Sequence, residues 1–172
     1  MSQFEAHDID FMKLALAAAT EAAGRWEVPV GAVVVVAGAV IGTGYNCREE
    51  RQSPLGHAEL MAVDEASKQL GTWRLDQCDM YVTLEPCLMC MGAILQARMR
   101  KLVFASLDPK AGAVESLYRL CEDQRLNHQL PALGGVLADE SAALLADFFA
   151  RLRSRKREIR KAERWPSPVE GA

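Results

Sequence analysis

Four residues in two separate stretches have the types and the spacing of a metal site with a neighbouring acid. Cys87 and Cys90 lie three positions apart, so on a helix both thiols project from one face and can bind one ion. Upstream, His57 and Glu59 offer a nitrogen ligand and a carboxylate. Zinc held by His57, Cys87 and Cys90 would keep one tetrahedral position open, as in catalytic zinc sites. We therefore predict one Zn²⁺ per subunit.

The open position predicts hydrolytic chemistry. Zinc lowers the pKa of a bound water from 15.7 to roughly 7, which gives a hydroxide at neutral pH. Attack of that hydroxide on an amino-substituted ring carbon also requires proton transfer to the ring nitrogen and to the departing ammonia. Glu59, which is not a ligand, is placed to carry those protons as general acid and base. H-x-E combined with P-C-x-x-C is the established signature of zinc-dependent nucleobase deaminases.

The same residues also have less specific interpretations. A C-x-x-C pair alone is typical of structural zinc and redox sites as well, and a histidine at a helix start can be a cap or a packed residue. A structural zinc would need a fourth ligand, for which Cys47, Cys78, Cys121 and His128 are available. The proline before the first cysteine makes the combined pattern much more specific, and we favour the catalytic interpretation.

Length and composition predict one ordinary globular domain. The 172 residues, half of them hydrophobic and a quarter charged, suffice for one buried core, which we assign to residues 1–165, with a flexible tail at 166–172. No signal peptide is expected, and the longest apolar run, Ala32 to Ala37, is too short to cross a membrane. Five cysteines, an odd number, favour a reducing cytoplasm over disulfides.

Hydrophobic periodicity predicts the elements that position these residues. Glycine and proline mark the boundaries, including a hairpin turn at Ala37-Gly38 and a loop over 45–53. His57 and Glu59, two residues apart, can reach one site only from the first turn of a helix. We expect a first helix from a cap at Asp8 or Asp10 to Ala23, and further helices over 57–71, 87–98, 114–120 and 138–163. Pro166 and Pro168 would end the last of them. We expect strands over 32–36, 39–42, 80–84, 101–105 and 129–133. This order predicts a three-layer α/β/α fold with a mixed five-stranded sheet.

Nearly the whole chain resembles the bacterial tRNA-specific adenosine deaminase family. The similar segments are Glu27-Val28-Pro29-Val30-Gly31-Ala32-Val33, Asn46, His57-Ala58-Glu59, Thr83 to Cys90, Asp108 to Ala113, Asn127-His128 and Leu137 to Phe149. The resemblance implies a cytidine deaminase-like fold and a homodimer. It also implies attack on C6 of the wobble adenosine, position 34 of a tRNA anticodon, which yields inosine and ammonia.

The resemblance further implies which residues bind the substrate, a base flipped out of the anticodon stem-loop. Asn46 would contact the nucleoside, and Val28, Pro29 and Leu84 would wall the base pocket. Asp108, Lys110, Asn127 and Phe149 match positions that the family uses near the RNA. Each of these also has a structural interpretation: Asn46 as a loop stabiliser, the others as loop caps or core packing.

Two further features bear on partners. The predicted helix at 87–98 is apolar nearly all round, which favours a second subunit as its cover. Residues 1–150 carry 12 basic and 20 acidic side chains, whereas Arg151 to Arg164 carries eight basic and two acidic. The stripe Arg153, Arg157, Arg160 and Arg164 fits either tRNA phosphates or a solvated helix end whose charge complements the helix dipole.

Two other functions stay open at this stage. A zinc deaminase of a free base or nucleoside, such as guanine, cytosine or cytidine, would share the motif and the fold. An RNA-binding or assembly subunit with an inert zinc site is the second, although it would not require Glu59.

Overall fold

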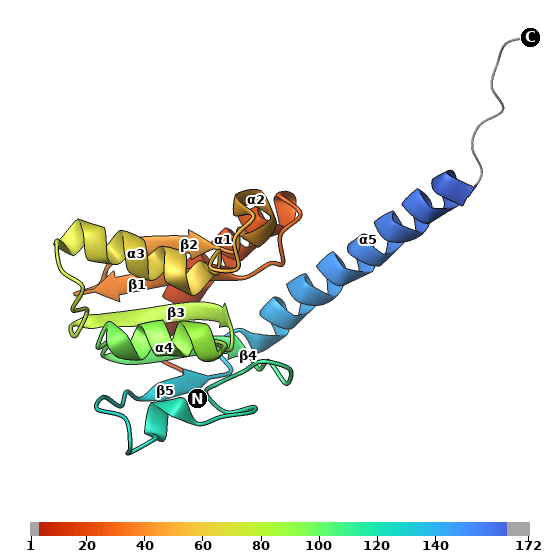
Figure 1. Ribbon diagram of the computed structural model, residues 1–172. Helices are drawn as coiled ribbons and strands as arrows, with labels where there is room; N and C mark the ends of the chain where they lie inside the picture. The colour runs from red at the N-terminus through yellow and green to blue at the C-terminus, as the bar shows by residue number, and fades with distance from the viewer. Residues whose placement is uncertain (1–3, 165–172) are drawn as a thin grey trace, which may run out of the picture.

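The computed structural model describes residues 4–164, with side chains as far as residue 161, and Figure 1 shows one mixed sheet between two layers of helices. The strands are β1 (Gly31–Val36), β2 (Ala39–Tyr45), β3 (Cys78–Leu84), β4 (Lys101–Ser106) and β5 (Ala132–Gly134), in the order β2-β1-β3-β4-β5. β1 is antiparallel to β2 and β3, and β4 is parallel to β3 and β5. The predicted fold class is confirmed.

The helices cover both faces of this sheet. They are α1 (Ala6–Gly24), α2 (Arg48–Arg51), α3 (Ala58–Leu70), α4 (Leu88–Gln96), a 3₁₀ turn η1 (Leu120–Glu122) and α5 (Ala138–Arg164). α3 and α4 pack on one face over a large apolar cluster that includes Met80 and Ile94. α1 packs on the other face over a smaller cluster around Met12 and Val103, and α5 begins beside it. Within the described residues, no helix is both long enough and apolar enough to span a membrane.

Two glycines let α3 lie directly against the edge strand β2. A Cβ atom on Gly44 would lie 2.0 Å from the Ala58 carbonyl oxygen, and one on Gly42 would lie 2.3 Å from the Ala62 carbonyl oxygen. Only glycine permits so close an approach of two backbones. The start of α3 is therefore fixed by contact between main chains.

Several predicted boundaries were wrong, each for a local reason. The predicted loop at 45–53 contains the last residue of β2 and the short helix α2. α4 ends at Gln96 instead of residue 98, because Arg98 has a left-handed φ of 62°. β5 begins at Ala132 instead of residue 129, since Pro131 has no N–H to donate to the sheet. Pro166, Pro168 and the predicted tail lie outside the described residues.

The largest error was the predicted helix at 114–120. Apolar residues recur there at helical spacing, but residues 114–117 form a turn and a bend, and only the 3₁₀ turn η1 begins at the last residue of the segment. The backbone N–H groups of Val114, Glu115 and Ser116 all donate to the carboxylate of Glu85. Further along, the N–H groups of Leu117 and Leu120 donate to the carbonyl oxygens of Gly112 and Ala113, five and seven positions back, so the i→i−4 hydrogen bonds of a helix do not form.

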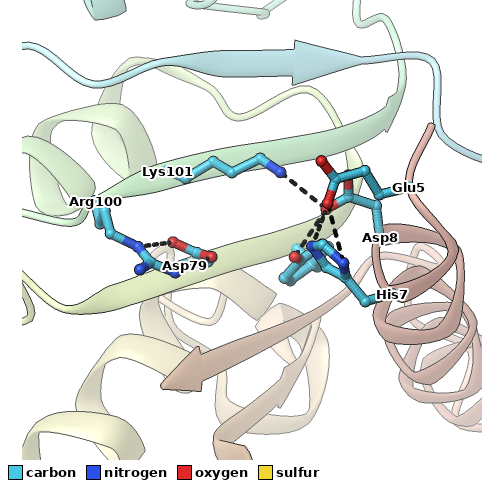
Figure 2. Close-up of polar contacts among 7 residues, drawn as sticks. Glu5, His7, Asp8, Asp79, Arg100 and Lys101 are labelled. Atoms are coloured by element: carbon cyan, nitrogen blue, oxygen red, sulfur yellow. Dashed lines mark hydrogen bonds and ion pairs between the residues drawn. The ribbon is translucent and has the colours of Figure 1, made fainter. Parts of the chain in front are cut away.

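Asp8, predicted as a possible cap of α1, instead joins that helix to the sheet. Glu5 occupies the N-cap position of α1, without a side-chain hydrogen bond. Figure 2 shows Asp8 pointing toward the strands, where its Oδ1 accepts from Tyr81 Oη and from Lys101 Nζ, both at 2.9 Å. These bonds satisfy a carboxylate that is 1% exposed. Burial raises the pKa of Tyr81, and the hydrogen bond to Asp8 raises it further. The phenol therefore keeps its proton and donates a hydrogen bond to Asp8.

We expect Asp8→Asn to lower the free energy of unfolding by about 2 kcal/mol, because the change leaves a half-buried ammonium without its carboxylate. Asp10→Asn is the matched control, since Asp10 is exposed and pairs only with Lys13 on the surface. Urea denaturation of the two variants measures the difference. Equal stabilities would show that the Asp8 contacts contribute nothing.

Candidate active site

The three predicted ligands converge at the carboxyl edge of the sheet. His57 is the N-cap residue of α3, and Cys87, just beyond β3, is the N-cap residue of α4. The two Sγ atoms are 3.7 Å apart, and His57 Nδ1 lies 3.8 Å from Cys87 Sγ and 3.4 Å from Cys90 Sγ. A tetrahedral zinc has bonds of about 2.3 Å to sulfur and 2.05 Å to nitrogen. This geometry requires about 3.8 Å between the two sulfur atoms and about 3.6 Å between the nitrogen and each sulfur atom. The residues therefore fit zinc.

The donor set also fits a catalytic zinc better than a structural one. Among the described residues, the group consists of His57, Cys87 and Cys90, and no other histidine, cysteine or carboxylate joins it as a fourth ligand. His128, one of the alternatives, has its Nε2 2.9 Å from the Met99 carbonyl oxygen. Three protein ligands leave one position for a reacting molecule.

The surroundings of the thiols favour metal binding. The hydrogen bonds with Cys90 and then His57 lower the pKa of Cys87 to about 3, and the N-terminus of α4 favours negative charge at the same place. The hydrogen bond with Cys87 raises the pKa of Cys90, as does burial. Cys87 therefore ionises more readily than Cys90 to the thiolate, the form that binds zinc.

Glu59 lies in the first turn of α3, two residues after His57, as the spacing predicted. Its side chain is buried, and burial raises the pKa of its carboxyl, an effect that the nearby His57 partly opposes. A carboxyl whose pKa is raised toward neutrality can both accept and donate a proton. The geometry therefore suits the predicted role in proton transfer.

A cavity of about 200 Å³ opens onto His57, Cys87 and Glu59. Of the predicted substrate residues, four line it: Val28, Asn46, Leu84 and Asp108. The sequence interpretation missed Val30, Arg48, Glu85 and Ala111, which line it as well. Drug-sized ligands occupy about 300–1,000 Å³, so this cavity suits a single base with the rest of its nucleotide outside.

The other four predicted substrate residues do not line this cavity. Pro29 is buried beside it, and Lys110 is exposed on the loop that follows Asp108. Asn127 is exposed, and its carbonyl oxygen accepts from Arg98 Nη1 at 2.8 Å. On α5, Phe149 is 41% exposed and packs edge to face on the buried Phe148, so one ring of the pair is in the core.

Glu85 builds one side of the cavity, although it was not predicted as a site residue. Its carboxylate accepts hydrogen bonds from the backbone N–H groups of Asp108, Val114, Glu115 and Ser116 at 2.7–3.0 Å and from the Ser116 hydroxyl. Burial would raise the pKa of Glu85, but these donors outweigh it and lower the pKa to about 2. The carboxylate thereby holds the whole loop from Asp108 to Ser116 beside the ligands.

Glu85→Gln should destabilise the protein by about 3 kcal/mol, because an amide presents one acceptor oxygen where the carboxylate presents two charged ones. Glu115→Gln makes the same chemical change on an exposed side chain of the same loop and is the control. Guanidinium denaturation at pH 7 compares the two. If Glu85→Gln is as stable as the control, the carboxylate does not hold the loop.

Comparison with known proteins assigns the chain to a family. Residues 5–106 match the cytidine and deoxycytidylate deaminase zinc-binding region. The chain is 45% identical over 151 residues to a tRNA-specific adenosine deaminase of Bacillus subtilis, which covers 88% of this chain and 94% of the relative. An Aquifex aeolicus protein of the same name is 41% identical over 84% of this chain and 95% of its own length.

Solved structures agree with this assignment. A structure from a study of A-to-I editing by tRNA:A34 deaminases at the wobble position of transfer RNA is 43% identical, with a TM-score of 0.76, over 79% of this chain and 99% of that one. A guanine deaminase from Nitrosomonas europaea shares the fold at 23% identity and a TM-score of 0.73, over 83% of this chain and 84% of its own. The chain therefore belongs to the cytidine and deoxycytidylate deaminase family of zinc-binding proteins, and within it to the tRNA-specific adenosine deaminases.

Proposed function

We propose that the protein hydrolyses the C6 amino group of the wobble adenosine, position 34 of a tRNA anticodon, to give inosine and ammonia. The observation that carries this proposal is the group of ligands formed by His57, Cys87 and Cys90, beside a small cavity that Glu59 also lines. The 45% identity with a tRNA-specific adenosine deaminase, over 88% of the chain, supports the choice of substrate.

In this mechanism three residues of the chain would bind the metal and a fourth would transfer protons. His57, Cys87 and Cys90 would hold zinc, which supplies the Lewis acidity that brings the pKa of water down to about 7. Glu59 takes one proton from the attacking water and delivers it to N1 of the ring, then takes the remaining proton from the new C6 hydroxyl and delivers it to the leaving amino group. Its burial excludes bulk water from these transfers and raises the pKa of the carboxyl, which favours its action as an acid as well as a base.

The walls of the cavity would select and orient the base. Val28 and Leu84 offer apolar surface to a planar ring, and Asn46 offers an amide that can donate and accept hydrogen bonds. The base has to leave its stack to enter so small a space, which an anticodon loop allows more easily than a duplex. Lys110, Asn127 and Phe149, outside the cavity, would contact the rest of the anticodon stem-loop.

We also propose a homodimer in the cytoplasm. The outer side of α4 presents Leu88, which is 49% exposed, together with the partly exposed Met89 and Ala93. An apolar helix face of this kind is stabilised when a second copy covers it. All five cysteines are free thiols, which is typical of proteins in a reducing compartment. The mass of the protein in solution tests the dimer.

One assay tests the proposed reaction. The protein is incubated with a tRNA that carries adenosine at position 34, with the same tRNA carrying guanosine there, and with free adenosine, guanine and cytosine. Inosine and ammonia are then measured. We expect release only from the adenosine-34 tRNA. Release only from free bases would refute the tRNA substrate, and release from none would favour an inert zinc site.

A further inference from the structure

The second half of α5 leaves the body of the protein. Figure 1 shows the helix beginning beside the sheet and projecting away from it. From Arg153 to Lys161 every side chain is exposed. Isolated helices of this length are marginally stable in water, so a projecting segment needs a contact that holds it. We call residues 151–161 the basic arm.

Trp26 supplies that contact. The guanidinium groups of Arg151 and Arg155 lie over its ring, 5.8 and 4.4 Å from the centroid. Trp26 has a left-handed φ of 62°, which a bulky residue adopts only where its surroundings enforce it. Its N–H donates to the Ala23 carbonyl oxygen at the end of α1, at 3.2 Å. The indole is therefore a fixed platform, 43% exposed, on which the arm rests.

This platform is joined to the active-site cavity through a short stretch of chain. Trp26 is two residues from Val28, which lines the cavity, and the intervening Glu27 accepts from the Glu50 N–H of α2 at 2.7 Å. α2 begins with Arg48, an exposed residue that also lines the cavity. Arg48 thus places one positive charge at the rim of the cavity, and the arm beyond the Trp26 contact carries several more.

Most positive charges of the arm form no ion pair with the described part of the protein. Arg151 pairs with Asp147 at 3.2 Å, but Arg153, Lys156, Arg157, Arg160 and Lys161 form no ion pair with any side chain within residues 4–161. Arg153, Arg157 and Arg160 follow one another at helical spacing and lie along one face. Only Leu152 and Ile159 are apolar there, too few for the apolar face by which helices bind membranes. Unpaired arginines in a row favour a polyanion.

We propose that the basic arm binds the phosphate backbone of the RNA stem that adjoins the loop whose base enters the cavity. This inference rests on the proposed function and adds a second contact region to it. Eleven residues of helix extend about 16 Å, enough to reach phosphates outside the loop. The Trp26 platform sets the direction of the arm, so RNA held by the arm presents its loop to the cavity.

The test compares charge reversal in the arm with the same reversal elsewhere. Arg153→Glu with Arg157→Glu is the test pair, and Lys13→Glu with Arg74→Glu is the control pair, on exposed side chains of α1 and of the loop before β3. Dissociation constants are measured by fluorescence anisotropy across a series of salt concentrations. The RNAs are an adenosine-34 tRNA and a seven-nucleotide anticodon-loop oligonucleotide without a stem.

We expect the test pair to weaken tRNA binding about tenfold or more and to reduce the slope of log K against log salt by about 2, one per lost phosphate contact. Binding of the loop oligonucleotide should match that of the unaltered protein, and the control pair should change neither. Trp26→Leu, which removes the ring but keeps an apolar side chain, should weaken tRNA binding in the same direction, because the arm loses its platform.

An unchanged affinity and salt slope in the test pair would overturn the proposal. So would an equal loss with the control pair, which would show a general effect of charge, or equal weakening for the loop oligonucleotide, which would place the arm on the loop. Binding to phosphatidylglycerol vesicles that is as tight as tRNA binding, and is lost in the test pair, would assign the arm to membranes. These assays score binding, so they are independent of whether the unaltered protein deaminates the tRNA.

Discussion

Glu59→Gln is expected to leave a folded, zinc-loaded protein whose turnover is lower by about 10²- to 10⁴-fold, the usual contribution of a general acid and base. The substitution keeps the shape of the side chain but removes its ability to exchange a proton. Glu59 is not one of the grouped ligands, so the zinc content should stay at one per chain. Inosine formation at saturating tRNA and zinc determination on the same sample measure both quantities.

The matched control is Glu49→Gln, on an exposed residue of α2 outside the cavity lining. It makes the same chemical change close to the site and should keep full turnover. Loss of zinc in Glu59→Gln would mean that the carboxylate stabilises the metal site. Turnover near that of the unaltered protein would refute proton transfer by Glu59.

Cys90→Ser should lose both zinc and activity. Cys90 is fully buried, with its Sγ 3.4 Å from His57 Nδ1 and 3.7 Å from Cys87 Sγ, and it is one of the three grouped ligands. A serine hydroxyl is a poor zinc ligand, and two remaining ligands hold the ion weakly. Because bound metal stabilises the folded state, the melting temperature should no longer rise when zinc is added.

Cys78→Ser is a close control for this variant. Cys78 is also fully buried, and it lies at the start of β3, whereas Cys87 lies just beyond its end. The change from thiol to hydroxyl costs stability in both variants, but only the Cys90 variant should lose zinc. One zinc per chain in Cys90→Ser would show that the thiol is not a ligand.

The sequence predicted the zinc site because its constraints are local. His57 and Glu59 can face one site only from the first turn of a helix, and Cys87 and Cys90 can do so only from one helical face, so their spacing determines the local backbone. The structure has His57 and Cys87 at the N-caps of α3 and α4. The strands followed in the same way from β-branched runs and the Ala37-Gly38 turn, where both residues have positive φ.

What the sequence did not reveal depends on contacts between distant segments. Glu85 and the amides of Val114 to Ser116 are about 30 positions apart, and no periodicity links them. An acidic residue between a buried strand and a metal ligand is a signal that could have been noticed, because a buried carboxylate requires donors. Asp8 is a similar case, since its partners Tyr81 and Lys101 lie on other elements.

The glycines of β2 have a consequence for motion at the active site. Side chains at an interface between a strand and a helix can change rotamer and let the helix shift, but Gly42 and Gly44 place no side chains under α3. His57 and Glu59 thus lie at the start of a helix whose backbone is held against the sheet, so we expect this end of α3 to shift only together with the sheet. Little reorganisation of these two groups is then needed when a base arrives, which is the condition under which fixed charges and proton carriers act most effectively.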